Sequence, residues 1–173
     1  MSVITVFNQK GGVGQTTTCL NLAAGLARMQ RNPLAIDVDA QAHLTTSCGL
    51  NGIGSHDSIA SFFKDERPLS DLLRTSAAGL QVIAGHAELA RIDALYGSNK
   101  KIAGKLRSGL GESFAERGTP ILIDCCPTLG VLTLNALLAA DRILIPVSAD
   151  YLSLRGVQRL ETEAKTLGQM LSL

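Results

Sequence analysis

The sequence has few aromatic residues: tryptophan is absent, and phenylalanine and tyrosine supply only 3% of its 173 positions. It also lacks a continuous apolar run of about 20 residues, the length that a membrane-spanning helix needs. The first residues, Met1 to Val3, have neither the basic nor the apolar region of a secretory signal. These absences predict a cytoplasmic protein that has no membrane partner.

Cysteine is scarce, and its four copies do not form a metal-binding pattern. They are Cys19, Cys48, Cys125 and Cys126, which lack the paired spacing of zinc ligands, and adjacent cysteines rarely bridge each other. We therefore expect reduced and buried thiols, as is usual in the cytosol. Charge is nearly balanced, and a formal net charge of +1 neither favours nor excludes a nucleic-acid partner.

Hydrophobic residues, in contrast, make up 46% of the chain, enough for a sizeable core in one domain over residues 1–173. Strands are predicted at 3–7, 33–39, 80–85, 120–124 and 142–147, and helices at 16–31, 132–140 and 154–171, with short helical pieces at 59–63 and 69–73 and a mainly helical stretch over 87–117. This alternation indicates an α/β fold, a single doubly wound and mainly parallel β-sheet with helices on both faces.

A glycine-rich segment joins the first predicted strand directly to the first predicted helix. It consists of Lys10, Gly11, Gly12, Val13, Gly14, Gln15, Thr16 and Thr17. Three glycines allow the backbone to curl with its N–H groups pointing inward, and the helix adds the positive end of its dipole. The segment therefore predicts a binding loop for a polyanion, most simply a nucleoside triphosphate. The alternative is a glycine-rich turn with an incidental lysine.

The loop departs from the usual pattern G-x-x-x-x-G-K-[ST] at two positions. Gln9 stands at the first glycine and Gln15 at the lysine, whereas Thr16 keeps the hydroxyl expected to ligate Mg²⁺. Glutamine donates hydrogen bonds but cannot offset phosphate charge, so we expect weaker nucleotide binding and slower hydrolysis. Three interpretations of Gln15 remain open: an engineered substitution, a natural variant with slow turnover, or a degenerate adaptor that binds no nucleotide.

Three aspartates, Asp37, Asp39 and Asp124, follow or end predicted strands. Ligands of parallel sheets bind outside the carboxyl ends of the strands, so these acids and the loop should converge on one pocket. A carboxylate beside a phosphate is useful only when it handles water or metal, and Asp124 is expected to hold Mg²⁺. An aspartate that merely caps a helix is the alternative for Asp37 and Asp39.

The early Lys10 followed by two glycines resembles the deviant Walker A loop of the ParA/MinD family of partition ATPases, and the ParA/Soj branch in particular. The resemblance covers nearly all of the chain in the same motif order: Asn8-Gln9, the D-x-D-x-Q segment at 37–41, the strand at 121–124, the segment DCCPTLG at 124–130, and the segments 132–137 and 145–147. Ala40 and Cys126 depart from it, because the family has proline there. Family members usually continue beyond the length seen here.

The resemblance implies a P-loop NTPase fold, ATP and Mg²⁺ as cofactors, and an ATPase activity that Gln15 weakens. Lys10 is expected to reach the nucleotide of a second protomer and Asp39 to orient the attacking water, which makes these two the catalytic candidates. Residues 10–17 are expected to bind the nucleotide. The candidate metal ligands are Thr16, Asp37 and Asp124.

The resemblance also implies partners: a homodimer formed with ATP, nonspecific nucleoid DNA, and a ParB-like or cargo adaptor protein in plasmid or chromosome segregation. The candidate DNA-binding residues are Lys100, Lys101, Lys105, Arg107, Arg155 and Arg159. A solvated helical surface is the alternative for the first four. The alternative function is a metabolic P-loop enzyme of the dethiobiotin synthetase or nitrogenase iron-protein type.

Overall fold

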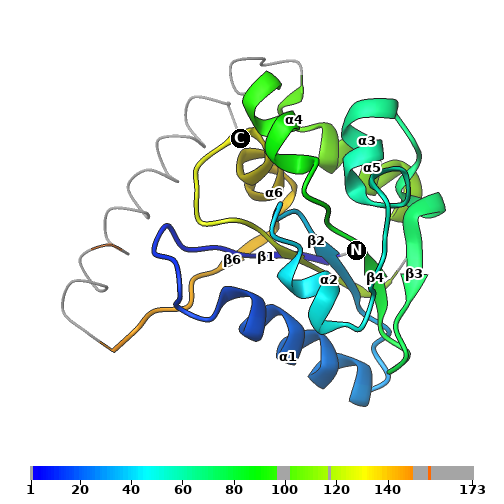
Figure 1. Cartoon of the computed structure of the whole chain (residues 1–173). Coiled ribbons are helices and arrows are strands. Elements are labelled where there is room, and N and C mark those ends of the chain that lie inside the picture. Colours follow the sequence, from blue (N-terminus) through cyan, green and yellow to red (C-terminus); the bar gives the residue numbers. More distant parts are fainter. Residues whose placement is uncertain (1, 97–101, 117, 150–155, 157–173) are drawn as a thin grey trace.

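The computed structural model describes residues 2–96, 102–116, 118–149 and 156, and the described part is built around one six-stranded sheet (Figure 1). The strand order is β3-β4-β2-β5-β1-β6. The strands are β1 (Ser2–Val6), β2 (Leu34–Asp37), β3 (Leu73–Thr75), β4 (Gln81–Ile83), β5 (Pro120–Asp124) and β6 (Arg142–Leu144). All neighbouring strands pair in parallel except β3, which is antiparallel to β4. The predicted α/β fold with a mainly parallel sheet is therefore confirmed.

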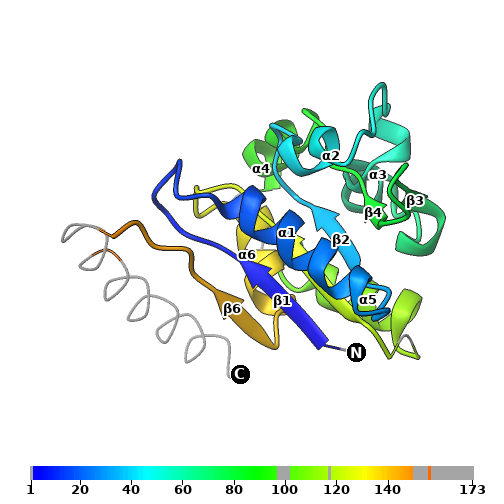
Figure 2. The ribbon, with the colours of Figure 1, turned by 90° about the horizontal axis from the view of Figure 1, so that it is seen from below.

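Helices cover both faces of this sheet (Figures 1 and 2). On one face lie α1 (Gln15–Arg28) and α2 (His43–Ser47), whose buried residues pack with Ala35 and Leu122 of the central strands. On the other face, Leu34 and Ile36 pack against the remaining helices: α3 (Ile59–Asp65), α4 (Leu89–Tyr96), α5 (Lys105–Phe114) and α6 (Val131–Ala139). Successive residues of β2 thus pack into the hydrophobic cores on opposite faces of the sheet, because successive strand side chains point to opposite faces.

The register of the central strands aligns their carboxyl ends. Val6 of β1 pairs with Asp124 of β5, and Asp37 of β2 pairs with Asp124 from the other side. The loop after β1 and the aspartates that end β2 and β5 therefore lie at the same edge of the sheet. This alignment is what brings the predicted site residues together.

The main difference from the predicted elements lies between residues 55 and 83. The predicted helical piece at 69–73 is the 3₁₀-helix η2 (Leu69–Leu72), and the antiparallel edge strand β3 that follows it was not predicted. A second 3₁₀-helix, η1 (Ser55–Asp57), precedes α3, and the mainly helical stretch 87–117 resolves into α4 and α5.

The predicted last helix, 154–171, lies outside the described residues apart from position 156. Among the helices of the described part, none has the length and apolar character required to cross a membrane.

Candidate nucleotide site

The loop between β1 and α1 has the open, curled backbone that the glycines predict. Gly12 and Gly14 adopt left-handed conformations with φ of 76° and 83°, which L side chains rarely adopt. Gly14 is also the residue before α1, and its carbonyl accepts the first helical hydrogen bond from Thr18 N at 2.8 Å. A Cβ atom built at Gly11, Gly12 or Gly14 meets no heavy atom within 4 Å. Space for an anion therefore lies directly in front of the loop.

Gln15, at the position of the usual lysine, is turned inward and is only 8% exposed. Its Oε1 accepts a hydrogen bond from the Asn8 backbone N–H at 3.1 Å, and its Nε2 donates to the Asn8 backbone carbonyl at 2.9 Å. The Gln15 side-chain amide thus bonds to both the backbone N–H and the backbone C=O of Asn8, as a residue of an adjacent β-strand would. We call this pair of bonds the Gln15–Asn8 clasp.

Asn8, which sequence reasoning did not single out as a site residue, is held at its side chain as well. Its Nδ2 donates to the Pro146 carbonyl at 2.7 Å, and its Oδ1 accepts from the Lys10 N–H at 3.0 Å. Asn8 is 5% exposed, so its own polar groups are shielded from bulk water. An asparagine directly after an apolar strand was the available signal for this role.

Asp124 ends β5 beneath the loop, and its side chain is the strongest indication of a metal site. The residue is 1% exposed, and neither carboxylate oxygen accepts a well-formed hydrogen bond among the described residues, although the Thr16 hydroxyl lies close enough to act on its pKa. Burial raises the pKa of this carboxyl to about 7; the Thr16 hydroxyl opposes the rise, and Asp37 and Asp39 add to it. Buried carboxylates are normally paired or bound to metal. An unpartnered carboxylate beside a threonine hydroxyl fits the oxygen ligands that Mg²⁺ prefers.

Asp37, in contrast, is already engaged by backbone and side-chain donors. Its Oδ1 accepts from Asp39 N at 3.1 Å, while its Oδ2 accepts from Thr45 N at 2.8 Å and from Thr45 Oγ1 at 2.7 Å. Thr45 Oγ1 accepts in turn from Gly85 N at 2.8 Å, which ties α2 to the end of β4. Burial raises the pKa of Asp37, and the bonds from Thr45 oppose this. Asp37 thus holds the segment that carries Asp39, and its predicted role as a metal ligand stays a prediction.

Asp39 is half-buried and lines the same cavity as the loop. Its Oδ1 accepts from Gln41 N at 2.9 Å, so the side chain also shapes the turn that leads into α2. The cavity has a volume of about 320 Å³. The described residues that line it are Gly11, Gly12, Gly14, Gln15, Thr16, Thr17, Asp39, Gln41, His43, Cys125 and Pro127. The structure therefore brings together most of the predicted loop with Asp39.

Four of these lining residues, Gln41, His43, Cys125 and Pro127, were not among the predicted site residues. Each lies within four positions of Asp39 or Asp124 in the sequence, and this short separation could have identified them as site residues. The Cys125 thiol is buried and donates to the Val6 carbonyl at 3.3 Å, so it ties the segment after β5 to β1. Burial, followed by the charge of Asp124, raises the pKa of Cys125 well above the ordinary thiol value.

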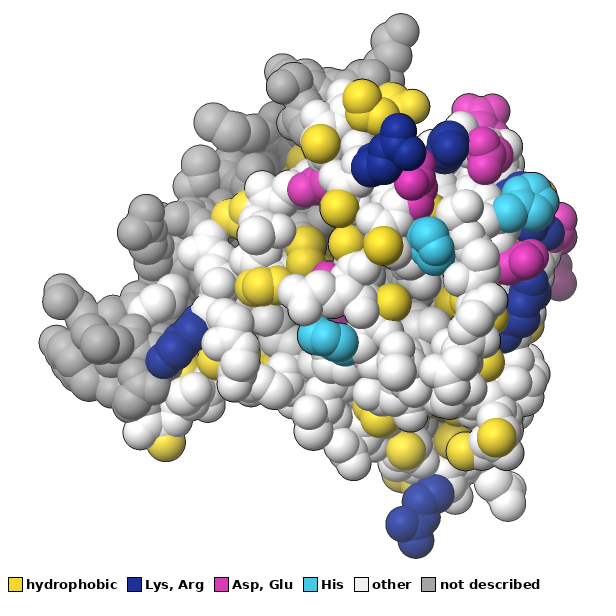
Figure 3. Space-filling model, viewed as in Figure 1, with side chains coloured by type: hydrophobic (Ala, Val, Ile, Leu, Met, Phe, Trp, Pro, Cys, Tyr) yellow, Lys and Arg dark blue, Asp and Glu magenta, His cyan; other side chains and the backbone are white. Residues whose placement is uncertain are grey.

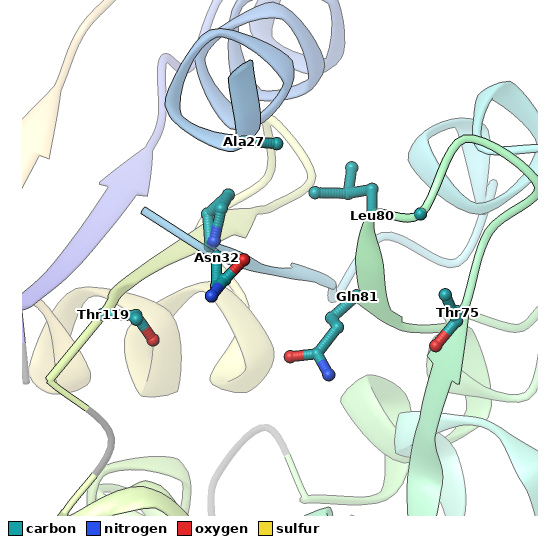
Figure 4. Close-up of a pocket in the computed structure, with 8 residues that line it drawn as sticks. Ala27, Asn32, Thr75, Leu80, Gln81 and Thr119 are labelled. Carbon is teal, nitrogen blue, oxygen red and sulfur yellow. The ribbon is translucent and has the colours of Figure 1, made fainter. Parts of the chain in front are cut away.

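A second cavity, of about 470 Å³, lies at the opposite ends of the strands (Figure 4). It is lined by Ala27, Asn32, Pro33, Thr75, Gly79, Leu80, Gln81 and Thr119. None of these described side chains carries a charge, and the cavity lies at the amino ends of β2 and β4. It has neither the glycine loop nor the acids that a metal–nucleotide complex requires, so we place the nucleotide at the loop.

The candidate DNA-binding cations are only partly described. Lys100, Lys101, Arg155 and Arg159 lie outside the described residues. Lys105 Nζ donates to the Phe63 carbonyl at 3.2 Å and lies 5.3 Å from the centre of the Phe62 ring, and Arg107 donates to the Leu138 carbonyl at 3.1 Å. On the face shown in Figure 3, lysine and arginine side chains are scattered, and several lie beside acids. A DNA-binding role for these residues stays a prediction.

The fold and site together define an α/β nucleotide-binding protein of the P-loop class. A family model described as "AAA domain" matches residues 1–172. The chain is 39% identical to the chromosome partitioning protein ParA of Myxococcus xanthus over 161 residues, which is 91% of this chain and 56% of that protein. It is 34% identical to the sporulation initiation inhibitor protein Soj of Bacillus subtilis, over 91% of this chain and 62% of that protein. The chain belongs to the ParA/MinD family of partition ATPases.

Solved structures share the fold of this chain. Cobyrinic acid a,c-diamide synthase of Mycobacterium smegmatis, with a bound ATP analogue and magnesium, matches with a TM-score of 0.88 and 30% identity, over 98% of this chain and 69% of that one. A plasmid partition protein of Borrelia burgdorferi matches with a TM-score of 0.85 and 26% identity, over 96% and 74%. The chain spans roughly three fifths of the ParA and Soj relatives (56% and 62%).

Proposed function

We propose that this chain is an ATP-binding partition protein, a switch in which nucleotide binding controls dimerisation during the segregation of a plasmid or chromosome. The observation that carries the proposal is the unpartnered, buried carboxylate of Asp124 beneath an open glycine loop. A divalent metal ion held by this carboxylate would give the buried charge a partner. Kinship with ParA and Soj supports the role in partition.

Each residue of the site has a distinct task in this proposal. The loop N–H groups of residues 11–17 would bind the phosphates, Thr16 and Asp124 would hold Mg²⁺, and Asp37 would lie beside its ligands. Bound Mg²⁺ supplies positive charge that offsets the charge of the phosphates. Asp39 lines the cavity and would orient water, and Lys10, which is exposed on the loop, would contact the nucleotide of a second protomer.

Isothermal titration of the metal-free protein with ATP and Mg²⁺ tests the proposed site. We expect saturable binding by the wild type and none by Asp124→Ala, because the variant loses the carboxylate that holds the ion. Sedimentation with and without MgATP then tests the switch, and a nucleotide-dependent dimer is the expected result. Equal nucleotide binding by both proteins contradicts the site, whereas binding without dimerisation contradicts only the switch.

We propose that hydrolysis is slow because Gln15 replaces the lysine. A hydrogen bond to a charged group contributes roughly 1.5–3 kcal/mol, so its weakening reduces nucleotide affinity about ten- to a hundredfold. Gln15→Lys is therefore expected to raise ATP turnover in a steady-state phosphate-release assay. Equal turnover by the two proteins contradicts the idea that the lysine is missed.

The proposed partners are nucleoid DNA and a ParB-like or cargo adaptor, in the cytoplasm. Nonspecific DNA binding neutralises phosphates with lysine and arginine and weakens steeply as salt rises. A gel-shift of duplex DNA with MgATP at two salt concentrations checks this partner. The absence of a shift, or a shift that does not depend on salt, removes the DNA hypothesis without touching the nucleotide site.

A metabolic enzyme is the second candidate function, and similarity to the cobyrinic acid a,c-diamide synthase of M. smegmatis favours it. That similarity reaches 30% identity, below the 39% identity to the ParA of M. xanthus. Such an enzyme couples ATP to the conversion of a small molecule, whereas a partition switch couples ATP to assembly. Conversion of a carboxylate substrate without nucleotide-dependent dimerisation supports the enzyme.

A further inference from the structure

The Gln15 side chain cannot extend toward a phosphate without breaking the Gln15–Asn8 clasp, although its Nε2 keeps a second, neutral N–H. Its acceptor and its amide donor are both bound to the Asn8 backbone, at 3.1 and 2.9 Å. Asn8 cannot follow Gln15 toward the cavity, because its own side chain bonds to Pro146 and Lys10. Moving Gln15 therefore leaves a buried N–H and a buried C=O unpaired, which is strongly unfavourable.

The described wall of the cavity also lacks a positive side chain that could bind a γ-phosphate. Among the described residues that line it, none is lysine or arginine, and Asp39 brings a negative charge. In the ordinary loop a lysine reaches the β- and γ-phosphates, while the backbone N–H groups cradle the α- and β-phosphates. The glycine loop is present in this chain, but the charged group that recognises the γ-phosphate is replaced by a neutral amide that is bound to the Asn8 backbone.

We propose that Gln15 is a specificity-determining residue that makes this site recognise a nucleoside diphosphate at least as well as a triphosphate. The inference rests on the proposed nucleotide site and deepens it. Gln15 brings no positive charge to the γ-phosphate and is held at Asn8, and the additional negative charge enters a cavity that contains Asp39. MgADP therefore binds with an affinity equal to or greater than that of MgATP.

Titration calorimetry with MgADP and MgATP, on the wild type and on three variants, tests this inference. We expect a wild-type ratio Kd(ATP)/Kd(ADP) of about 1 or more. Gln15→Lys restores a charge that reaches the γ-phosphate, and its ratio is expected to fall about tenfold. Gln15→Met removes the amide at similar length and adds no charge, so its ratio should stay near the wild-type value while its melting temperature falls. Gln41→Lys adds the same charge from the other wall of the cavity and controls for charge alone.

The outcomes separate this inference from the proposed function. A wild type that binds MgATP ten times more tightly than MgADP overturns the inference and leaves the nucleotide site standing. A shift in Gln41→Lys equal to that in Gln15→Lys also overturns it, because position 15 then has no special role. Binding of neither nucleotide to the wild type overturns the proposed site itself. If Gln15→Lys does not fold, the wild-type ratio alone decides.

Discussion

Asp124→Asn is expected to make the metal-free protein more stable at alkaline pH, although it removes a residue of the proposed site. The side chain is 1% exposed and its oxygens have no hydrogen-bond partner among the described residues. Its pKa of about 7 in the folded protein lies above the ordinary value of 3.8. Keeping this carboxylate ionised therefore costs folding free energy whenever the pH is high and no cation is bound.

The size and the pH window of this effect follow from the two pKa values. Because the folded pKa is raised, the folded state retains a proton that the unfolded state has lost between pH 3.8 and about 7, and stability falls as pH rises through this window. A difference of about 3 pH units corresponds to ~4 kcal/mol, fully expressed above pH 7 and absent below pH 3.8. Near pH 5 only about 1.6 kcal/mol of this cost has developed. We take these values as ceilings, since an asparagine amide also needs partners.

Urea unfolding at pH 5 and pH 8 in the presence of a chelator measures the effect. The variant should be more stable than the wild type, and its advantage should be larger at pH 8. Mg²⁺ with ADP should stabilise the wild type and not the variant, because binding to the folded state raises apparent stability. Asp39→Asn removes a half-buried acid from the same cavity and serves as the control. A variant equally or less stable than the wild type at pH 8 refutes the account of Asp124.

Two further predictions concern the framework around the site, and both are measured as free energies of unfolding. Thr45→Val removes the hydroxyl that accepts from Gly85 N, leaving a buried N–H unpaired, and should cost about 1–3 kcal/mol. Thr45→Ser keeps the hydroxyl and should recover most of this loss; equal stability of all three proteins contradicts the role of the hydroxyl. Gly130→Ala places a methyl group on the Asp93 carboxylate and should cost about 1–3 kcal/mol. The control is Gly111→Ala in α5, where the added carbon meets no heavy atom, and this variant should not lose stability. Equal stability of the two alanine variants refutes the steric explanation.

The strands and the meeting of loop and acids were predictable, because apolar runs, glycine punctuation and the geometry of parallel sheets act over short distances. The edge strand β3 was not, because its three residues, Leu73–Thr75, are half-buried or exposed and carry no clear period. Its pairing with β4 depends on where the two segments meet in space. The sequence indicated that Asp37 belongs to the site, but only its distance to Thr45, eight residues away, reveals its structural role.

The orientation of Gln15 was the least predictable feature, because it depends on the partners that the fold supplies. A lysine at this position brings a charge that must face a phosphate or water, whereas an amide can donate and accept at once. The buried Asn8 backbone offers an acceptor and a donor side by side, so the amide is satisfied without a ligand. Exchanging lysine for glutamine therefore does more than remove a charge.

Without a lysine at position 15, the positive charge that balances bound phosphates must come from another group. With Gln15 held at Asn8, the described cavity wall offers phosphates backbone N–H groups and the side chains of Thr16, Thr17, Gln41 and His43, but no lysine or arginine. Asp39 lines the same cavity, and Asp124 is buried nearby. Neutral donors cannot balance a polyphosphate next to two carboxylates, so the metal ion carries a larger share of this task than it does in a loop with its lysine. In the proposed function, the buried Asp124 carboxylate and the Gln15–Asn8 clasp therefore both favour binding of the metal together with the nucleotide.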